Sequence, residues 1–171
     1  MIDILRKRRS IRKFKQLPVE NSKLKTLEEA ILRSPSSRNL KPWKFIFVTD
    51  KKLLKKLAEA KSAGGKFLED APLAVVVLGD AEVSDAWIED CSIAATILQL
   101  TAETLDLGSC WVQIRGRKHS NNLSASAFIR KELHIHAEME VASVIALGYP
   151  DEEKEPVSEH KLDWEKTALL V

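Results

Sequence analysis

Residues 85–107 read DAWIEDCSIAATILQLTAETLDL, and this stretch decides the fold because it predicts one long helix at the centre of the molecule. Apolar side chains cover two sides of that helix: Trp87, Cys91, Ala94, Ala95, Leu98, Ala102 and Leu105 fall on one, and Ile93, Ile97, Leu100 and Leu107 on another. A helix that is apolar around most of its circumference lies in a core or in a subunit interface. Gly108 is expected to end it.

The segments on either side of this helix predict a mixture of helices and strands. Helices are expected at about 2–8, 19–33, 51–62 and 124–133, and strands at about 43–49, 73–78, 109–114 and 141–147. The continuous apolar run 73–78 is typical of a strand that is covered on both faces. Because helices come first and then alternate irregularly with strands, the order favours an α+β domain over a strict βαβ alternation.

The chain has 171 residues, which predicts a single domain over residues 1–150 and a highly charged tail over residues 151–171. The net charge of +2 is too small to attract nucleic acid or a membrane surface in general. The N-terminus does not have the pattern of a signal peptide, and no apolar run is long enough to span a membrane. The two isolated cysteines, Cys91 and Cys110, favour a reducing compartment and no metal site, so a cytoplasmic protein is expected.

A cationic stretch lies near the N-terminus, where residues 6–15 hold seven Lys or Arg. Its centre is Arg8-Arg9-Ser10-Ile11-Arg12. Guanidinium groups and a hydroxyl are donors that suit a phosphate dianion, and each charge-assisted hydrogen bond contributes about 1.5–3 kcal/mol. The alternatives are a solvated basic surface or a nucleic-acid patch.

A polar loop follows the second predicted helix and reads Pro35-Ser36-Ser37-Arg38-Asn39-Leu40-Lys41-Pro42-Trp43. Asn39 carries both donors and an acceptor, which suits the polar edge of a flat heteroaromatic ring. The alternative is a simple turn that ends a helix and uses its polar side chains for local hydrogen bonds. None of the six glycines forms GxGxxG or GxxxxGK[ST], so the dinucleotide-binding and P-loop motifs are disfavoured.

Four motifs in this order resemble the nitroreductase family of FMN-dependent NAD(P)H oxidoreductases. They are the Arg8–Arg12 stretch, the Pro35–Trp43 loop, Leu107-Gly108-Ser109-Cys110-Trp111 after an alanine-rich helix, and Gly148-Tyr149-Pro150. The resemblance implies a three-layer α+β fold with a central, mostly antiparallel sheet flanked by helices. It also implies an intertwined homodimer with two FMN sites at its interface and a tail that packs on the partner subunit.

The resemblance further assigns FMN-binding residues to three groups. The first group holds the phosphate, the ribityl chain and the pyrimidine side of the ring, and consists of Arg8, Arg9, Ser10 and Arg12. The second comes from the partner subunit and consists of Pro35, Ser36, Ser37 and Asn39. The third lines the other ring edge, with a backbone N–H donating to flavin N5, and consists of Gln113, Ile114 and Arg115.

The activity implied is hydride transfer from NADH or NADPH through flavin N5 to a small nitroaromatic or quinone-like acceptor, by a ping-pong scheme without a catalytic protein residue. A non-catalytic flavin-binding module, and a reductive dehalogenase or flavin-cleaving relative, stay open. The chain departs from the family in its tail, where glutamates crowd the region and only Lys154, His160 and Lys161 could reach the phosphate. Arg38 and Lys41 either favour anionic acceptors at the pocket mouth or are solvated loop charges.

Overall fold

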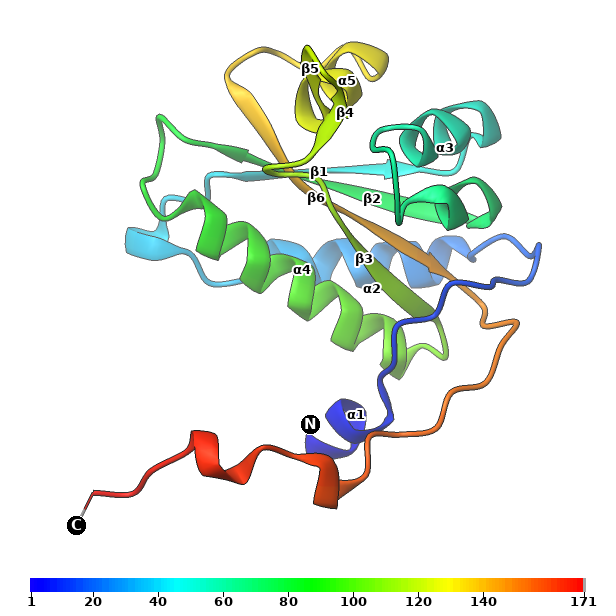
Figure 1. Ribbon diagram of the computed structural model, residues 1–171, viewed down its shortest axis with the longest axis vertical. Coiled ribbons are helices and arrows are strands. Elements are labelled where there is room, and N and C mark those ends of the chain that lie inside the picture. The colour runs from blue at the N-terminus through cyan, green and yellow to red at the C-terminus, as the bar shows by residue number, and fades with distance from the viewer. Residues whose placement is uncertain (171) are drawn as a thin grey trace.

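The computed structural model describes residues 1–170 and shows an α+β domain built on a four-stranded sheet (Figure 1). The strand order is β1 (Trp43–Val48), β2 (Leu73–Asp80), β6 (Met139–Gly148) and β3 (Gly108–Gln113). All three pairings are antiparallel. The central strands β2 and β6 are almost entirely buried, and β1 and β3 form the edges. The predicted fold class and its four strands are confirmed.

Helices cover both faces of the sheet. On one face lie α2 (Asn21–Leu32) and α4 (Trp87–Thr104), and on the other lie α3 (Lys51–Ala58) and α5 (Ala125–Glu132). Strand β2 shows why two cores form, since Leu73, Val75 and Val77 pack toward α2 and α4 while the alternate residues pack toward α3 and α5. The three layers expected from the resemblance are therefore present.

The remaining elements are short. They are α1 (Ile2–Lys7), the two-stranded β4 (Lys118–Ser120) and β5 (Leu123–Ser124), and the 3₁₀ turns η1 (Ser37–Asn39), η2 (Lys66–Asp70), η3 (Glu159–Lys161) and η4 (Trp164–Lys166). Within residues 1–170, none of the helices combines the length and the apolar character that a bilayer crossing would need.

Helix α4 is shorter than the predicted 85–107 helix, and Gly108 does not end it. Asp106 takes the left-handed conformation that closes the helix, with φ of 58°, and the Leu107 amide then donates to the Ala102 carbonyl at 2.9 Å. Gly108 has another role, because a Cβ there would lie 2.9 Å from the Ile11 side chain. Leu107 is buried instead of lying on the outer side of the helix. Helix α3 likewise ends at Ala58, before the predicted Ser62.

One side of α4 packs on the sheet and the other stays uncovered in the single chain. Trp87, Cys91 and Leu98 are buried against the strands. On the opposite stripe, Ile97 is partly exposed and Ile93 is 41% exposed. The prediction of a helix that is apolar on both sides is confirmed.

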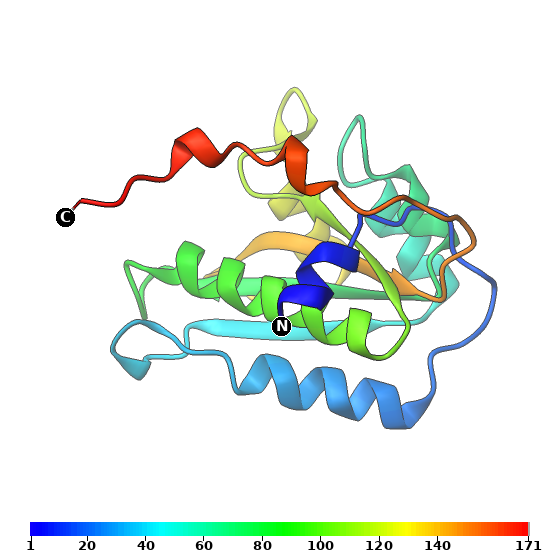
Figure 2. The same cartoon turned by 90° about the horizontal axis from the view of Figure 1, so that it is seen from below.

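The N-terminal segment and the tail run side by side past the edge strand β3. Ser10 forms a parallel bridge with Ser109 at the start of β3, and Phe14 forms an antiparallel bridge with Pro150. The tail stays beside the N-terminal segment as far as Glu155 and then leaves the body and extends into solvent (Figure 2). Its apolar side chains are therefore open, with Trp164 61% exposed and Leu170 94% exposed.

Candidate functional site

The predicted phosphate-binding stretch is fixed to the sheet through Ile11. The Ile11 amide donates to the Ser109 carbonyl at 3.0 Å, and the Ile11 side chain is buried against Gly108. Its neighbours Ser10 and Arg12 stay at the surface, partly exposed and exposed respectively. An apolar anchor between polar residues thus holds their donors at the edge of β3.

The charges of this stretch converge on the Cys110 thiol, which lies on β3 next to Ser109. Burial raises the pKa of Cys110, whereas the Arg12 guanidinium, a hydrogen bond from Ser10, the Lys154 ammonium and the Arg8 guanidinium each favour its thiolate. Arg8, Ser10 and Arg12 occupy alternate positions of the segment beside β3, and the Lys154 ammonium joins them there by donating to the Ser10 carbonyl. The structure brings together three of the four residues predicted for the phosphate half, and we call this group, with Lys154, the cationic cluster.

Arg9, the fourth predicted residue, points to the tail. Its guanidinium donates to the backbone carbonyl of Glu155. In this conformation the tail therefore engages the Arg9 guanidinium.

The tail supplies Lys154 to the cationic cluster. Its ammonium donates to the Ser10 carbonyl at 3.0 Å and lies 3.4 Å from the Glu152 carboxylate. Glu152 in turn accepts hydrogen bonds from the amides of Arg12 at 2.5 Å and Lys13 at 3.2 Å. Of the three tail cations considered from the sequence, Lys154 is the one at the cluster, and the nearby acidic residue holds the backbone of the cluster in place.

These contacts also set the charge of Glu152. The hydrogen bond from the Arg12 amide, followed by the Lys13 amide and the Lys154 charge, lowers the pKa of Glu152 despite its partial burial. The carboxylate therefore stays ionised near neutral pH and keeps its hold on the segment.

The second predicted group forms a strained loop at the other end of α4. Arg38, Asn39 and Lys41 all have left-handed backbones, with φ of 52°, 56° and 50°, a conformation that costs about 1–3 kcal/mol for a residue with a side chain. Ser36 Oγ accepts from the Lys41 amide at 2.9 Å, and Asp90 Oδ1 accepts from the Ser37 amide at 2.8 Å. We call residues 35–42 the strained loop.

The polar side chains of the strained loop differ in what they contact. Asn39 is exposed, and its side-chain amide makes no hydrogen bond within residues 1–170. Arg38 pairs with Asp85, so much of its charge is already compensated. Asn39 is thus open to a ligand. The ion pair with Asp85 favours the interpretation of Arg38 as a loop charge over that of a cation which attracts anionic acceptors.

A single chain does not bring the two predicted halves together. Lys7, next to the cationic cluster, forms an ion pair of 3.6 Å with Glu103 in the last turn of α4. The strained loop contacts Asp90 in the first turn of the same helix. With a rise of 1.5 Å per residue, these anchor points lie about 20 Å apart along the axis. In Figures 1 and 2, η1 lies near the start of α4, whereas α1 lies beside the later part of the same helix.

The third predicted group lies at the far end of β3. Gln113 accepts from the Trp111 indole at 3.0 Å and donates to the Arg115 carbonyl at 2.9 Å. Ile114 is fully buried, and the amides of Ile114 and Arg115 both point to the Ala142 carbonyl, at 3.4 and 3.0 Å. In this conformation Ile114 offers no side chain to a ligand, and neither amide is free to donate to one. Gln113 and Arg115 keep side chains at the surface.

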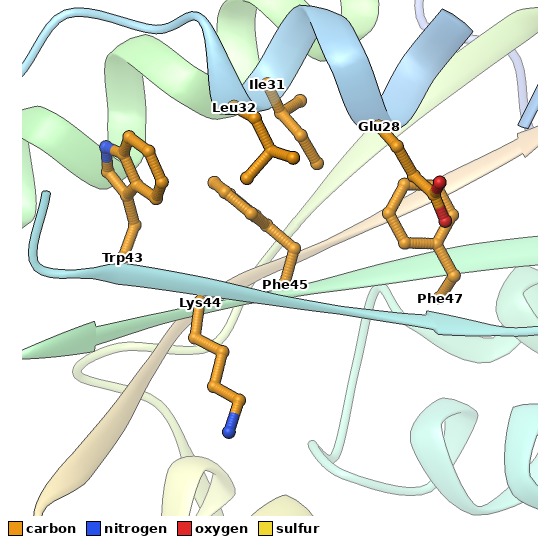
Figure 3. Close-up of a pocket in the computed structure, with 7 residues that line it drawn as sticks. All are labelled: Glu28, Ile31, Leu32, Trp43, Lys44, Phe45 and Phe47. Atoms are coloured by element: carbon orange, nitrogen blue, oxygen red, sulfur yellow. The ribbon is translucent and has the colours of Figure 1, made fainter. Parts of the chain in front are cut away.

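A groove lies between α2 and β1, and its lining differs from the cationic cluster because it is mainly aromatic. Its volume is about 320 Å³, and Trp43, Phe45 and Phe47 line it from β1 (Figure 3). Lys44 points away from it, toward the opposite face of the sheet. Because this groove has no inward-pointing cation, it does not suit a phosphate.

The Cys91 thiol does not have the low pKa that is typical of a nucleophilic cysteine. Burial raises the pKa of the Cys91 thiol to about 12, so it is neutral at physiological pH. Among residues 1–170, no three His, Cys, Asp or Glu residues lie close enough to hold a metal ion.

The comparison with protein families matches residues 5–64 and 60–149 to the Nitroreductase family. A protein of Archaeoglobus fulgidus with the provisional name NADH dehydrogenase/NAD(P)H nitroreductase is 35% identical over 152 residues, which cover 86% of this chain and 84% of that protein.

Solved structures are similar over most or nearly all of this chain. An FMN-dependent nitroreductase from Clostridium difficile R20291 has a TM-score of 0.97 and 46% identity, over 99% of this chain and 98% of that one. A nitroreductase family protein from Clostridium novyi NT has a TM-score of 0.78 and 25% identity, over 88% and 85%.

Proposed function

The chain belongs to the nitroreductase family, and from that premise we propose that it is an FMN-dependent oxidoreductase which passes hydride from NADH or NADPH to a small nitroaromatic or quinone-like acceptor. Donor and acceptor would use one pocket in turn, as in a ping-pong scheme. The observation that supports the proposal is that the Arg8–Arg12 stretch meets the tail beside β3, where the Lys154 ammonium donates to the Ser10 carbonyl at 3.0 Å. The two free, buried cysteines agree with a cytoplasmic setting.

The cationic cluster has the donor set that an FMN phosphate requires. Arg8 and Arg12 offer forked guanidinium donors, Lys154 a point charge and Ser10 a hydroxyl. Several charge-assisted hydrogen bonds of about 1.5–3 kcal/mol each would retain the cofactor without a glycine-rich loop. We assign the phosphate and ribityl chain to Arg8, Ser10 and Lys154, without Arg9, and the pyrimidine side of the ring to Arg12.

When bound, FMN supplies the hydride-accepting ring, and the protein binds and orients it. The Arg12 guanidinium would stabilise negative charge on the pyrimidine side of the reduced ring. Gln113 and Arg115 would line the other edge, where the Arg115 guanidinium lies 5.8 Å from the centre of the Trp87 ring. This arrangement does not require a protein nucleophile or general base.

We also propose a homodimer in which the strained loop of one protomer, through Pro35, Ser36, Ser37 and Asn39, completes the site of its partner. The separation of the two halves within one chain supports this arrangement. The uncovered α4 stripe at Ile93 supplies an apolar surface for the interface. The open apolar side chains of the tail also need cover, and we propose that the tail packs on the partner subunit.

The visible spectrum of the purified protein tests the proposal most simply. We expect the absorption bands of oxidised flavin to stay with the protein through gel filtration at 0.5 M salt. Rapid anaerobic mixing with NADH or NADPH should then bleach these bands within seconds and transfer the electrons to an added quinone.

Each alternative predicts a different result. A flavin-binding module without activity would keep its colour and bleach slowly with both donors. A nucleic-acid-binding protein would be colourless, and its complex would weaken steeply with salt. A colourless protein that does not take up added FMN would overturn the proposal.

A further inference from the structure

Asp90 is a buried carboxylate that is only partly satisfied. It lies in the first turn of α4 and is 2% exposed. Oδ1 accepts from the Ser37 amide at 2.8 Å, and Oδ2 has no hydrogen-bond partner within residues 1–170. Burial of an ionised carboxylate is costly unless several donors surround it. General helix stability does not explain this residue, because a first-turn carboxylate could favour the helix dipole from the surface.

Asp90 contacts the strained loop at Ser37, next to the residues with left-handed backbones. Ser37 immediately precedes Arg38 and Asn39, both of which have left-handed backbones. Asparagine tolerates this conformation, but a long side chain such as that of Arg38 adopts it only when its surroundings hold it there. Other contacts hold this part of the loop less firmly: Ser36 Oγ bonds within the loop itself, and the Arg38–Asp85 pair is solvent-exposed. The Asp80 amide donates to the Pro42 carbonyl at 3.0 Å and fixes only the end of the loop next to β1.

Asp90 connects the loop to the rigid core. Trp87 and Cys91, its neighbours on the buried side of α4, pack so closely on β2 that a Cβ at Gly79 would lie 2.3 Å from the Trp87 ring and 2.9 Å from the Cys91 sulfur. Such a tight contact fixes the first turns of α4 relative to the sheet. The Ser37 amide is therefore held at a defined place by a group that itself cannot move far.

We propose that Asp90 is a positioning residue, which sets the Ser37 amide and with it the strained loop in the geometry that receives the flavin ring of the partner subunit. The inference rests on the proposed function, because only that function gives the loop a flavin to contact. A carboxylate does this better than an amide, since charge-assisted hydrogen bonds are about twice as strong as neutral ones. The hydrogen bond to the Ser37 amide therefore accounts for a carboxylate at this buried position.

The test compares Asp90→Ala and Asp90→Asn with Glu89→Ala. Glu89 is an exposed carboxylate on the same helical turn and provides the matched control. Asp90→Ala removes the acceptor, whereas Asp90→Asn keeps an oxygen for the Ser37 amide. We expect the FMN dissociation constant to rise about tenfold or more in Asp90→Ala, about threefold in Asp90→Asn, and less than twofold in Glu89→Ala.

Two further readouts separate positioning from loss of stability. Hydrogen exchange of the Ser37 amide should be faster in Asp90→Ala, while exchange in β2 stays at the wild-type rate. The midpoint potential of the bound flavin should shift in Asp90→Ala and return toward the wild-type value in Asp90→Asn. If Asp90→Ala is insoluble, Asp90→Ser carries the same expectations, because its shorter side chain does not reach Ser37.

The outcomes distinguish this inference from the proposed function. A wild-type protein that binds no FMN overturns both. A wild-type protein that binds FMN, with an unchanged dissociation constant and potential in Asp90→Ala, overturns the role of Asp90 alone. Insolubility of all three Asp90 variants would show a requirement for folding and would also overturn the positioning role.

Discussion

The cationic cluster and the strained loop are held in opposite ways. The cluster lies on a segment that bonds to β3 through the Ile11 amide and is buttressed by Glu152 from the tail. The loop has a disfavoured backbone, depends on one buried carboxylate and leaves Asn39 open to solvent. The difference suggests that the first region is complete within one chain, whereas the second is built to meet another molecule.

The largest expected effect comes from removal of charge in the cluster. Arg8→Ala/Arg12→Ala removes the charge-assisted hydrogen bonds of Arg8 to the phosphate and of Arg12 to the pyrimidine side of the ring, so FMN affinity should fall at least about 100-fold and the purified protein should be colourless. Lys13→Ala/Lys15→Ala removes the same charge from the same stretch and should stay yellow. A double arginine variant with full flavin absorbance would contradict the assignment of the phosphate.

The next test separates the loop from the cluster through the proposed interface. Ile93→Glu/Ile97→Glu places two charges on the uncovered α4 stripe, and we expect a monomer by sedimentation at micromolar concentration. Because a monomer lacks the second half of the site, its FMN affinity should fall about tenfold or more, with unchanged circular dichroism. Leu17→Glu, at another exposed apolar position (51%), is the control. A monomer with wild-type flavin affinity would show that the strained loop of a partner subunit does not contribute to FMN binding.

A smaller effect is expected where the N-terminal segment meets β3. Gly108→Ala places a Cβ 2.9 Å from Ile11, so the segment must shift, at a cost of about 1–3 kcal/mol in the free energy of unfolding. FMN affinity should fall with it, because Ser10 and Arg12 flank Ile11. Gly116→Ala strains a left-handed glycine with open space around it (φ 72°) and should lower stability without an effect on flavin. Equal flavin loss in both variants would count against a specific role for the Ile11 contact.

The smallest effect concerns the tail and pH. The folded structure lowers the pKa of Glu152 below its ordinary value of 4.5, so the carboxylate stabilises the folded tail above that pH. The stabilisation is lost as the pH falls through the lowered pKa, when the group takes up a proton. Limited proteolysis of the tail should therefore accelerate as the pH falls below 4.5, through the lowered pKa of Glu152. Glu152→Gln should show faster cleavage of the tail already at neutral pH and little further change on acidification. If the cleavage rate of this variant depended on pH as in the wild type, Glu152 would not be the group that stabilises the tail.

Local patterns in the sequence predict most of the fold. The continuous apolar run 73–78 and the apolar sides of α4 specify a sheet covered on both faces and its helical layers, because burial follows the pattern of each element. The end of α4 is different. Asp106 closes it, and Gly108 instead allows the approach of Ile11, a contact between segments about 100 residues apart that no local pattern contains.

The candidate site could be predicted in part. Arg8, Ser10 and Arg12 lie together as their spacing suggested, but Arg9 turns to the tail and Lys154 takes a place in the cluster. Both depend on the path of the tail, which its charged sequence does not specify. Asp90 was missed, although a signal was present: it is three residues after Trp87, on the helix face predicted to be buried.

Subunit complementation tests most directly whether each flavin site is built from two chains. One chain carries Arg8→Ala/Arg12→Ala, the other carries Ser36→Ala/Asn39→Ala, and differently tagged copies are purified as mixed dimers after each variant alone has been shown to bind FMN poorly. If the cluster of one protomer works with the loop of its partner, the mixed dimer has one intact site and should hold one FMN per two chains. Mixed dimers that hold no FMN would show that both halves act within a single chain, and would contradict the account.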